Sequence, residues 1–168
     1  MSRRTAAAPA LLLHRVALRR AVSGREHRVG LWRYLLGADI ATLQTAPLIY
    51  SMLVPFLLLD AWVTAYQAIC FRAWGIRRVR RRDYFAIDRH KLPYLNAIER
   101  VHCLYCSYAN GLSAYVREIS ARTEQYWCPI RHAGPIAEPH RRYQDFVAYG
   151  DGAGYRKQLP SLREQLKK

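Results

Sequence analysis

The sequence predicts a mainly α-helical protein with one membrane-spanning helix and a small cytoplasmic helical hairpin domain, for which a bound metal is a candidate staple. Three features predict this class: a long apolar run, basic residues on both sides of it, and helical spacing around cysteines further on. The length of 168 residues suits one small domain with an anchor. The hydrophobic content of 51% is too high for a disordered chain, and four cysteines are too few for a secreted disulfide scaffold.

The N-terminal segment, residues 1–45, is predicted to be a basic amphipathic arm. Residues 6–22 mix Ala, Leu and Arg without an acidic residue, which is also typical of an organellar transit peptide. Their apolar spacing equally suits a bacterial arm that lies on the membrane. We favour the bacterial inner membrane as the location, with a mitochondrial membrane as the alternative.

The apolar run, residues 46–71, is predicted to be the transmembrane helix. At about 1.5 Å per residue, a helix of this length crosses a hydrocarbon core of about 30 Å. Trp62 and Trp74 lie toward its basic end, where aromatic rings favour the headgroup region. The alternatives are a buried helix of a soluble protein, a helix lying in the membrane interface, and a re-entrant helix hinged at Pro55.

Asp60 is the one charged residue in this run. An ionised carboxylate that faces lipid at mid-span costs about 2.5 to 3.5 kcal/mol, so we expect Asp60 to be protonated, paired, or turned toward another protein. Its functional interpretation is a contact or proton-handling residue within a larger membrane assembly. The structural interpretation is a shallow helix that brings Asp60 near the headgroups.

The segment that follows, residues 72–91, is predicted to be a basic juxtamembrane segment. Its excess of arginine should contact anionic lipid and, by the positive-inside rule, should place the C-terminal part in the cytoplasm. A solvated charge run without a lipid role is the alternative. The candidate lipid contacts are Arg72, Arg77, Arg78, Arg80, Arg81 and Arg82.

Residues 92–168 are predicted to form the small helical domain. Apolar residues recur at helical spacing over 94–105 and again over 112–125, with Asn110-Gly111 as a break between them. This pattern predicts two helices joined by a tight turn.

The cysteines and one histidine of this domain form a candidate metal site. Cys103-x2-Cys106 followed by Cys128-x3-His132 supplies three thiolates and an imidazole, the number and type of ligands that tetrahedral zinc takes. The site fails if Cys103 and Cys106 lie inside the first helix, because a helix would then part the two halves. An iron–sulfur cluster, thiol chemistry, and cysteines that merely pack between helices are the alternatives.

Three sequence blocks carry a resemblance. The residues 105–111 (YCSYANG), 114–119 (AYVREI) and 121–130 (ARTEQYWCPI), followed by His132, resemble a group of uncharacterised bacterial proteins with the same CxYC, NG and RTEQYWCPI elements. The resemblance covers roughly residues 84–155. It implies a bacterial source and a small cysteine-containing helical domain, and it transfers no activity.

Function is predicted from these parts without a complete catalytic motif. The leading hypothesis is a membrane-anchored accessory or interaction subunit with a structural Cys3His metal site, whose partners are anionic lipid and another membrane protein. The competing hypothesis is a thiol- or metal-dependent oxidoreductase at the membrane. The formal net charge of +15 keeps a nucleic-acid binder as the third and weakest class.

Overall fold

A computed structural model describes residues 25–167, which are mainly helical and contain no β-strand within that range. Residues 1–24 of the predicted N-terminal arm, residues 1–45, lie outside the described residues. The described chain divides into two compact units. Unit 1 comprises residues 25–50 and 87–108, and unit 2 comprises residues 51–86 and 109–167.

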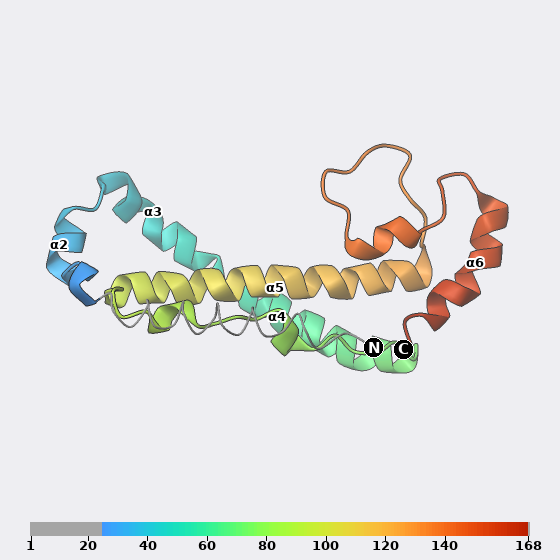
Figure 1. Cartoon of the computed structure of the whole chain (residues 1–168), viewed down its shortest axis with the longest axis horizontal. Coiled ribbons are helices and arrows are strands. Elements are labelled where there is room, and N and C mark those ends of the chain that lie inside the picture. Colours follow the sequence, from blue (N-terminus) through green and yellow to red (C-terminus); the bar gives the residue numbers. More distant parts are fainter. Residues whose placement is uncertain (1–24, 168) are drawn as a thin grey trace, which may run out of the picture. The chain divides into compact units, whose positions relative to one another are not determined.

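The α-helices follow one another with short helical turns between them (Figure 1). They are α2 (Leu31–Leu36), α3 (Ile40–Ser51), α4 (Leu53–Tyr66), α5 (Ala97–Trp127) and α6 (Gly152–Glu164). The turns are η1 (Arg25–His27), the π-helical η2 (Gln67–Phe71), η3 (Arg81–Asp83), η4 (Arg89–Lys91) and η5 (Arg141–Asp145).

The apolar segment is helical from Ile40 to Phe71, a length of 32 residues, and is long and apolar enough to cross a membrane. It begins six residues before the predicted start. The helix is interrupted at Met52 because the ring nitrogen of Pro55 cannot donate a hydrogen bond to the carbonyl of Ser51. Only 6% of the most apolar stretch of this segment is buried among the described residues, whereas the core helix of a soluble domain would be mostly covered.

The prediction of a helical hairpin was wrong, because α5 is one continuous helix of 31 residues (Figure 1). It begins with a reciprocal cap, in which the Glu99 amide donates to Asn96 Oδ1 at 3.0 Å and the Asn96 amide donates to Glu99 Oε2 at 2.8 Å. It ends just before Cys128-Pro129, where the proline disfavours helical backbone in the preceding residue.

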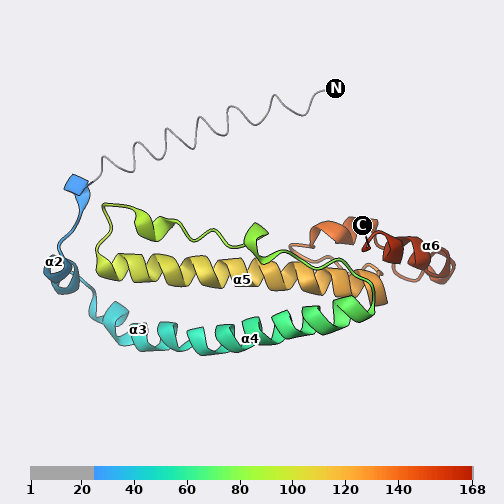
Figure 2. The same cartoon turned by 90° about the horizontal axis from the view of Figure 1, so that it is seen from below.

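Gly111 lies inside α5 for a packing reason and not for a turn. A Cβ atom on Gly111 would lie 2.9 Å from Cδ1 of Phe85 and 3.1 Å from the carbonyl oxygen of Tyr84. The missing side chain lets residues 84–85 approach the helix closely, as Figure 2 shows for the segment that runs beside α5. The glycine that the sequence pattern marked as a helix break is therefore a close-contact position in a continuous helix.

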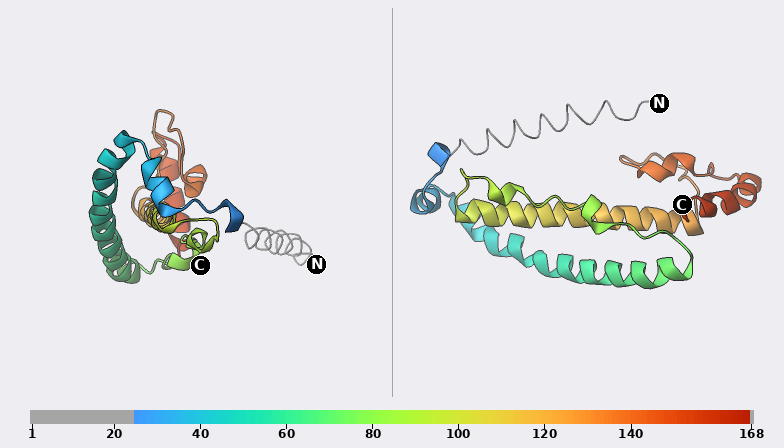
Figure 3. Two further views of the ribbon diagram at one scale, coloured as in Figure 1. Left: turned by 90° about the vertical axis from the view of Figure 1, so that its left-hand side faces the viewer. Right: turned by 60° about the horizontal axis from the view of Figure 1, so that its bottom comes forward.

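In unit 2, α4 lies beside the C-terminal half of α5 and runs in the same direction (Figures 2 and 3). The core between them and the segment after η2 is mainly apolar, and Phe71, Leu112 and Ile119 are almost fully buried. Tyr66 and Thr123 join the two helices through their hydroxyl groups, whose oxygens are 2.9 Å apart.

The C-terminal part of unit 2 folds back onto the end of α5. Gln125 Nε2 donates to the carbonyl of Leu162 in α6 at 2.8 Å. The amide of Arg77 donates to the carbonyl of Leu166 at 2.9 Å, which ties the basic segment to the end of the chain. Leu162 and Leu166 are both buried. These contacts bring the basic segment, α5 and the C-terminal elements around one cavity.

In unit 1, α3 packs against the first half of α5 through aromatic residues. The Tyr105 hydroxyl donates to the carbonyl of Ile49 at 3.0 Å. The ring of Tyr50 lies 5.9 Å from the rings of both His102 and Tyr105. The end of α3 is thus fixed beside polar and aromatic side chains of α5.

Candidate functional site

The two faces of α4 differ in an unusual way. The face of α4 that packs inside unit 2 contains Asp60 and Val63, and it continues into η2 with Gln67, so both strongly polar residues of this stretch lie on the packed side. The outward face contains large apolar side chains, including Leu58 with 67% and Trp62 with 79% of their surface exposed. This is the reverse of a helix on the surface of a soluble domain, whose polar residues face water.

Asp60 is paired, as one of the three sequence-based alternatives expected. The Arg81 guanidinium donates to both carboxylate oxygens of Asp60, with Nη2 2.7 Å from Oδ2. It also lies over the ring of Phe85, 4.1 Å from the ring centroid. The Asp60 side chain is only 14% exposed, so the pair turns the carboxylate away from the outward face of α4.

Gln67 is the second polar residue on the inner face, and it is 1% exposed. Its amide nitrogen donates to the Tyr115 hydroxyl at 2.7 Å, and its amide oxygen accepts from the backbone amide of Val79. Both ends of the amide group are therefore satisfied. The second bond also fixes the basic segment against the end of the apolar helix.

The six arginines predicted as lipid contacts do not behave alike. The guanidinium of Arg81 binds the carboxylate of Asp60 within the protein, so it is already engaged by a protein group. Arg72 is exposed beyond the end of η2, and Arg82 has 76% of its side chain exposed. The remaining three, Arg77, Arg78 and Arg80, line a cavity of about 240 Å³ in unit 2.

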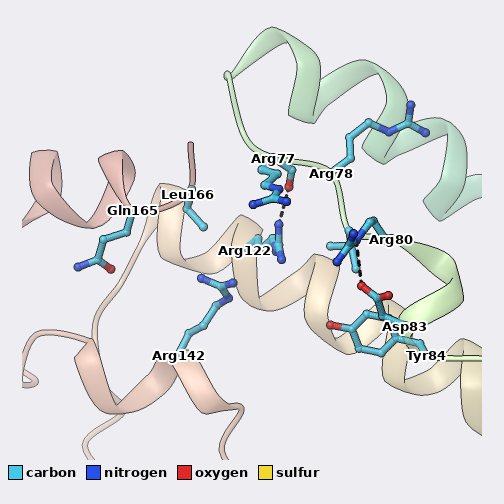
Figure 4. Close-up of a pocket in the computed structure, with 10 residues that line it drawn as sticks. Arg77, Arg78, Arg80, Asp83, Tyr84, Arg122, Arg142, Gln165 and Leu166 are labelled. Atoms are coloured by element: carbon cyan, nitrogen blue, oxygen red, sulfur yellow. Dashed lines mark hydrogen bonds and ion pairs between the residues drawn. The ribbon is translucent and has the colours of Figure 1, made fainter. Parts of the chain in front are cut away.

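This cavity is rich in guanidinium groups. Figure 4 shows Arg77, Arg122 and Arg142 pointing toward one another from the basic segment, α5 and η5. The other lining residues are Arg78, Val79, Arg80, Asp83, Tyr84, Gln165 and Leu166. An anion is the ligand that such an arrangement favours, because guanidinium groups bind phosphate and carboxylate oxygens with paired hydrogen bonds.

Glu118 holds two of these arginines in place. Its Oε1 atom accepts from Arg122 Nε at 2.8 Å and from Arg142 Nη2 at 2.9 Å. Arg122 also donates to the carbonyl of Arg77, and Arg142 donates to Gln125 Oε1 at 2.9 Å. Burial raises the pKa of Glu118, but the hydrogen bonds from both arginines outweigh it and hold the pKa below its ordinary value.

The four predicted metal ligands are not brought together. Cys103 and Cys106 both lie inside α5, which is the arrangement for which the sequence argument expected the site to fail, and Cys128 follows the end of the same helix. The 22 residues from Cys106 to Cys128 correspond to about 33 Å of helix. Among residues 25–167, no group of three or more His, Cys, Asp or Glu side chains is placed to hold a metal ion.

His132 has other contacts. Its ring stacks on that of Tyr143 with the centroids 6.0 Å apart, and its backbone amide donates to the Tyr143 hydroxyl at 2.6 Å. These contacts give His132 a structural place in the loop after α5. The residues present therefore do not fit a Cys3His zinc site or an iron–sulfur cluster in this conformation of the chain.

Cys103 and Cys106 also lack the setting of a redox pair. A reactive Cys-x2-Cys usually lies at a helix N-terminus, where the helix dipole lowers the thiol pKa. Here α5 begins at Ala97, so both cysteines are more than one turn inside the helix. None of the four cysteines, all of which lie among the described residues, forms a disulfide.

The sequence reasoning missed the cavity. The pairing of Glu118 with Arg122 has a sequence signal, because residues four apart on a helix face one another. Arg142 has none, since it reaches Glu118 from a segment 24 residues away. Comparison of the chain with protein-family profiles, with curated proteins and with solved structures finds no significant match.

Proposed function

We propose that this protein is a membrane-bound interaction protein, in which the outward face of α4 contacts lipid and the opposite face carries a polar helical domain. The observation that carries the proposal is the reversed polarity of α4. Polar groups within membrane helices face other protein segments and pair there, as Asp60 and Gln67 do.

The charged neighbours of α4 favour a helix that lies in the plane of the membrane surface. In unit 2, α4 is accompanied by α5, which carries Arg117, Glu118 and Arg122 along the packed stretch. A perpendicular crossing by α4 would bring these charges to the depth of the hydrocarbon core, at a cost of about 2.5 to 3.5 kcal/mol each on insertion scales. A helix that lies in the interface keeps them in water.

The exposed arginines support an anionic membrane surface as the partner. Each basic residue near such a surface contributes about 1 kcal/mol, and the exposed Arg72 and Arg82 follow the apolar helix directly. Because basic segments resist translocation, we place the domain on the cytoplasmic face. The sequence resemblance implies a bacterial source, so we propose the bacterial inner membrane as the location.

Vesicle flotation with two charge-matched double variants tests the lipid face. Leu58→Asp/Trp62→Asp places carboxylates on the outward face of α4, and Ile136→Asp/Tyr149→Asp places them on exposed apolar residues of the C-terminal region. The first pair should reduce binding to phosphatidylcholine vesicles by about tenfold or more, and the second should leave it nearly unchanged. Equal binding by both variants would overturn the proposal.

The in-plane position is tested by labelling from one side of the membrane. In a cysteine-free background, Asp39→Cys and Arg72→Cys mark exposed positions at the two ends of the apolar helix. An in-plane helix should expose both thiols to an impermeant maleimide on the cytoplasmic side only. Labelling of the two positions from opposite sides would show a span and would overturn this position.

A further inference from the structure

The basic segment after the apolar helix is a built part of the fold and not a loose run of charge. Ile76 and Val79 are each 5% exposed and anchor it in the core of unit 2. The Ile76 amide donates to the Phe71 carbonyl at 2.8 Å, and the Arg77 amide donates to the Leu166 carbonyl at 2.9 Å. Arg77 and Arg80 therefore start from a fixed backbone.

The other side of the cavity is also organised before any ligand arrives. Arg122 and Arg142 have only 17% and 27% of their side chains exposed, and Glu118 holds both of them. Guanidinium groups held in this way lose little conformational entropy when they bind an anion. Tyr84 and Gln165 add further hydrogen-bond donors to the lining.

The charge of the cavity is unbalanced. Arg77, Arg80, Arg122 and Arg142 line it, whereas the side chain of Arg78 points away from the other arginines (Figure 4). Against these four guanidinium groups stand the carboxylate of Asp83 in the lining and that of Glu118 behind it, which leaves a net charge of +2. Arg80 Nε already donates to Asp83 Oδ2 at 3.1 Å, so this carboxylate is paired with Arg80. An entering anion would offset the remaining mutual repulsion of the arginines.

We propose that this cavity binds a phosphate group, carried either by an anionic lipid headgroup or by a soluble phosphate compound. Phosphate suits a cavity lined by guanidinium groups, because a planar guanidinium matches its oxygens with paired hydrogen bonds. Arg122 and Arg142 already donate to Glu118, so they contribute mainly positive charge. The lipid source rests on the proposed membrane function, whereas binding of soluble phosphate does not depend on it.

The test uses the full chain in detergent and two double variants that remove the same charge. Arg77→Gln/Arg80→Gln changes the cavity lining, and Arg131→Gln/Arg156→Gln changes exposed arginines of the C-terminal region that neither line the cavity nor follow the apolar helix. Circular dichroism verifies that both variants keep the helical signal. One arm titrates inorganic phosphate by calorimetry, and the other measures flotation with phosphatidylcholine vesicles with and without phosphatidic acid.

The cavity pair should weaken binding by about tenfold or more in at least one arm, while the control pair changes it by less than about twofold. An effect on phosphatidic acid vesicles identifies a lipid headgroup as the source, and an effect on inorganic phosphate alone identifies a soluble compound. Equal effects of both pairs, or no effect of the cavity pair in either arm, would overturn the site.

The two proposals fail in different ways. If the protein does not float with phosphatidylcholine vesicles but inorganic phosphate binding depends on Arg77 and Arg80, the membrane proposal falls and the cavity stands. If flotation depends on Leu58 and Trp62 but neither arm depends on the cavity pair, the cavity falls and the membrane proposal stands.

Discussion

The Arg81 guanidinium donates to both carboxylate oxygens of Asp60, with Nη2 2.7 Å from Oδ2, although the two residues are 21 positions apart. Asp60 is the one acidic residue of the apolar helix, and the pair points it into unit 2. The same arginine covers the ring of Phe85. Arg81 thereby links α4 to the segment that packs against Gly111 of α5.

Removal of Arg81 should destabilise unit 2. Arg81→Gln leaves the carboxylate of Asp60, which is 14% exposed, without its charge partner. We expect a loss of about 1 to 3 kcal/mol in the free energy of unfolding, measured with denaturant in detergent. Arg82→Gln, at a side chain with 76% exposure, should cost less than about 0.5 kcal/mol. Similar losses for both variants would contradict a structural role for the pair.

Gly111→Ala should destabilise the protein even though alanine is the better helix former by about 1 kcal/mol. The new Cβ would lie 2.9 Å from Cδ1 of Phe85 and 3.1 Å from the backbone oxygen of Tyr84, so the segment beside α5 must move. Thermal unfolding should show a lower midpoint than for the unmodified chain. The control is Ser113→Ala at an exposed position of α5, which should leave the midpoint nearly unchanged. A higher midpoint for Gly111→Ala would show that the close approach is not maintained.

Acid should weaken the contact of Glu118 with its arginines. The pKa of Glu118 lies below its ordinary value, so its ionised form stabilises the fold above about pH 4.5, and this contribution is lost as the pH falls through the lowered pKa. The stability difference between the unmodified chain and Glu118→Gln should therefore be largest near neutral pH and shrink in acid. Unfolding at a series of pH values measures it. The control is Glu26→Gln, at a side chain with 70% exposure, which should show a small difference at every pH. A difference for Glu118→Gln that does not change with pH would contradict the assignment.

The metal content of the purified protein tests whether the predicted Cys3His site exists. Because α5 is continuous between Cys106 and Cys128, we expect the purified chain to contain less than about one tenth of an equivalent of zinc or iron under reducing conditions. Elemental analysis measures this directly. About one equivalent of zinc that is lost in Cys128→Ser but kept in Cys70→Ser would show instead that the four residues converge, and α5 would then have to break.

Local patterns predicted the helices well and their connections poorly. The spacing of apolar residues over 94–105 and 112–125 correctly predicted helix in both stretches, except that the helix begins only at Ala97. The Asn110-Gly111 pair wrongly predicted a turn between them, because glycine is common in turns, where it adopts many backbone conformations. Only the approach of Phe85, from a segment 26 positions earlier, shows why a glycine is placed within a helix.

The sequence by itself determined that the chain is mainly helical, that it contains a segment long and apolar enough to cross a membrane, and that arginines follow this segment. These properties depend on composition and on spacing within a few turns of chain. The tertiary structure decided which arginine pairs with Asp60, which arginines share a cavity with Arg122 and Arg142, and that Cys103 and Cys106 lie inside the helix whose end precedes Cys128. Those relationships join residues distant in the chain, and they arise because buried polar groups must find partners wherever the packing of the helices brings them.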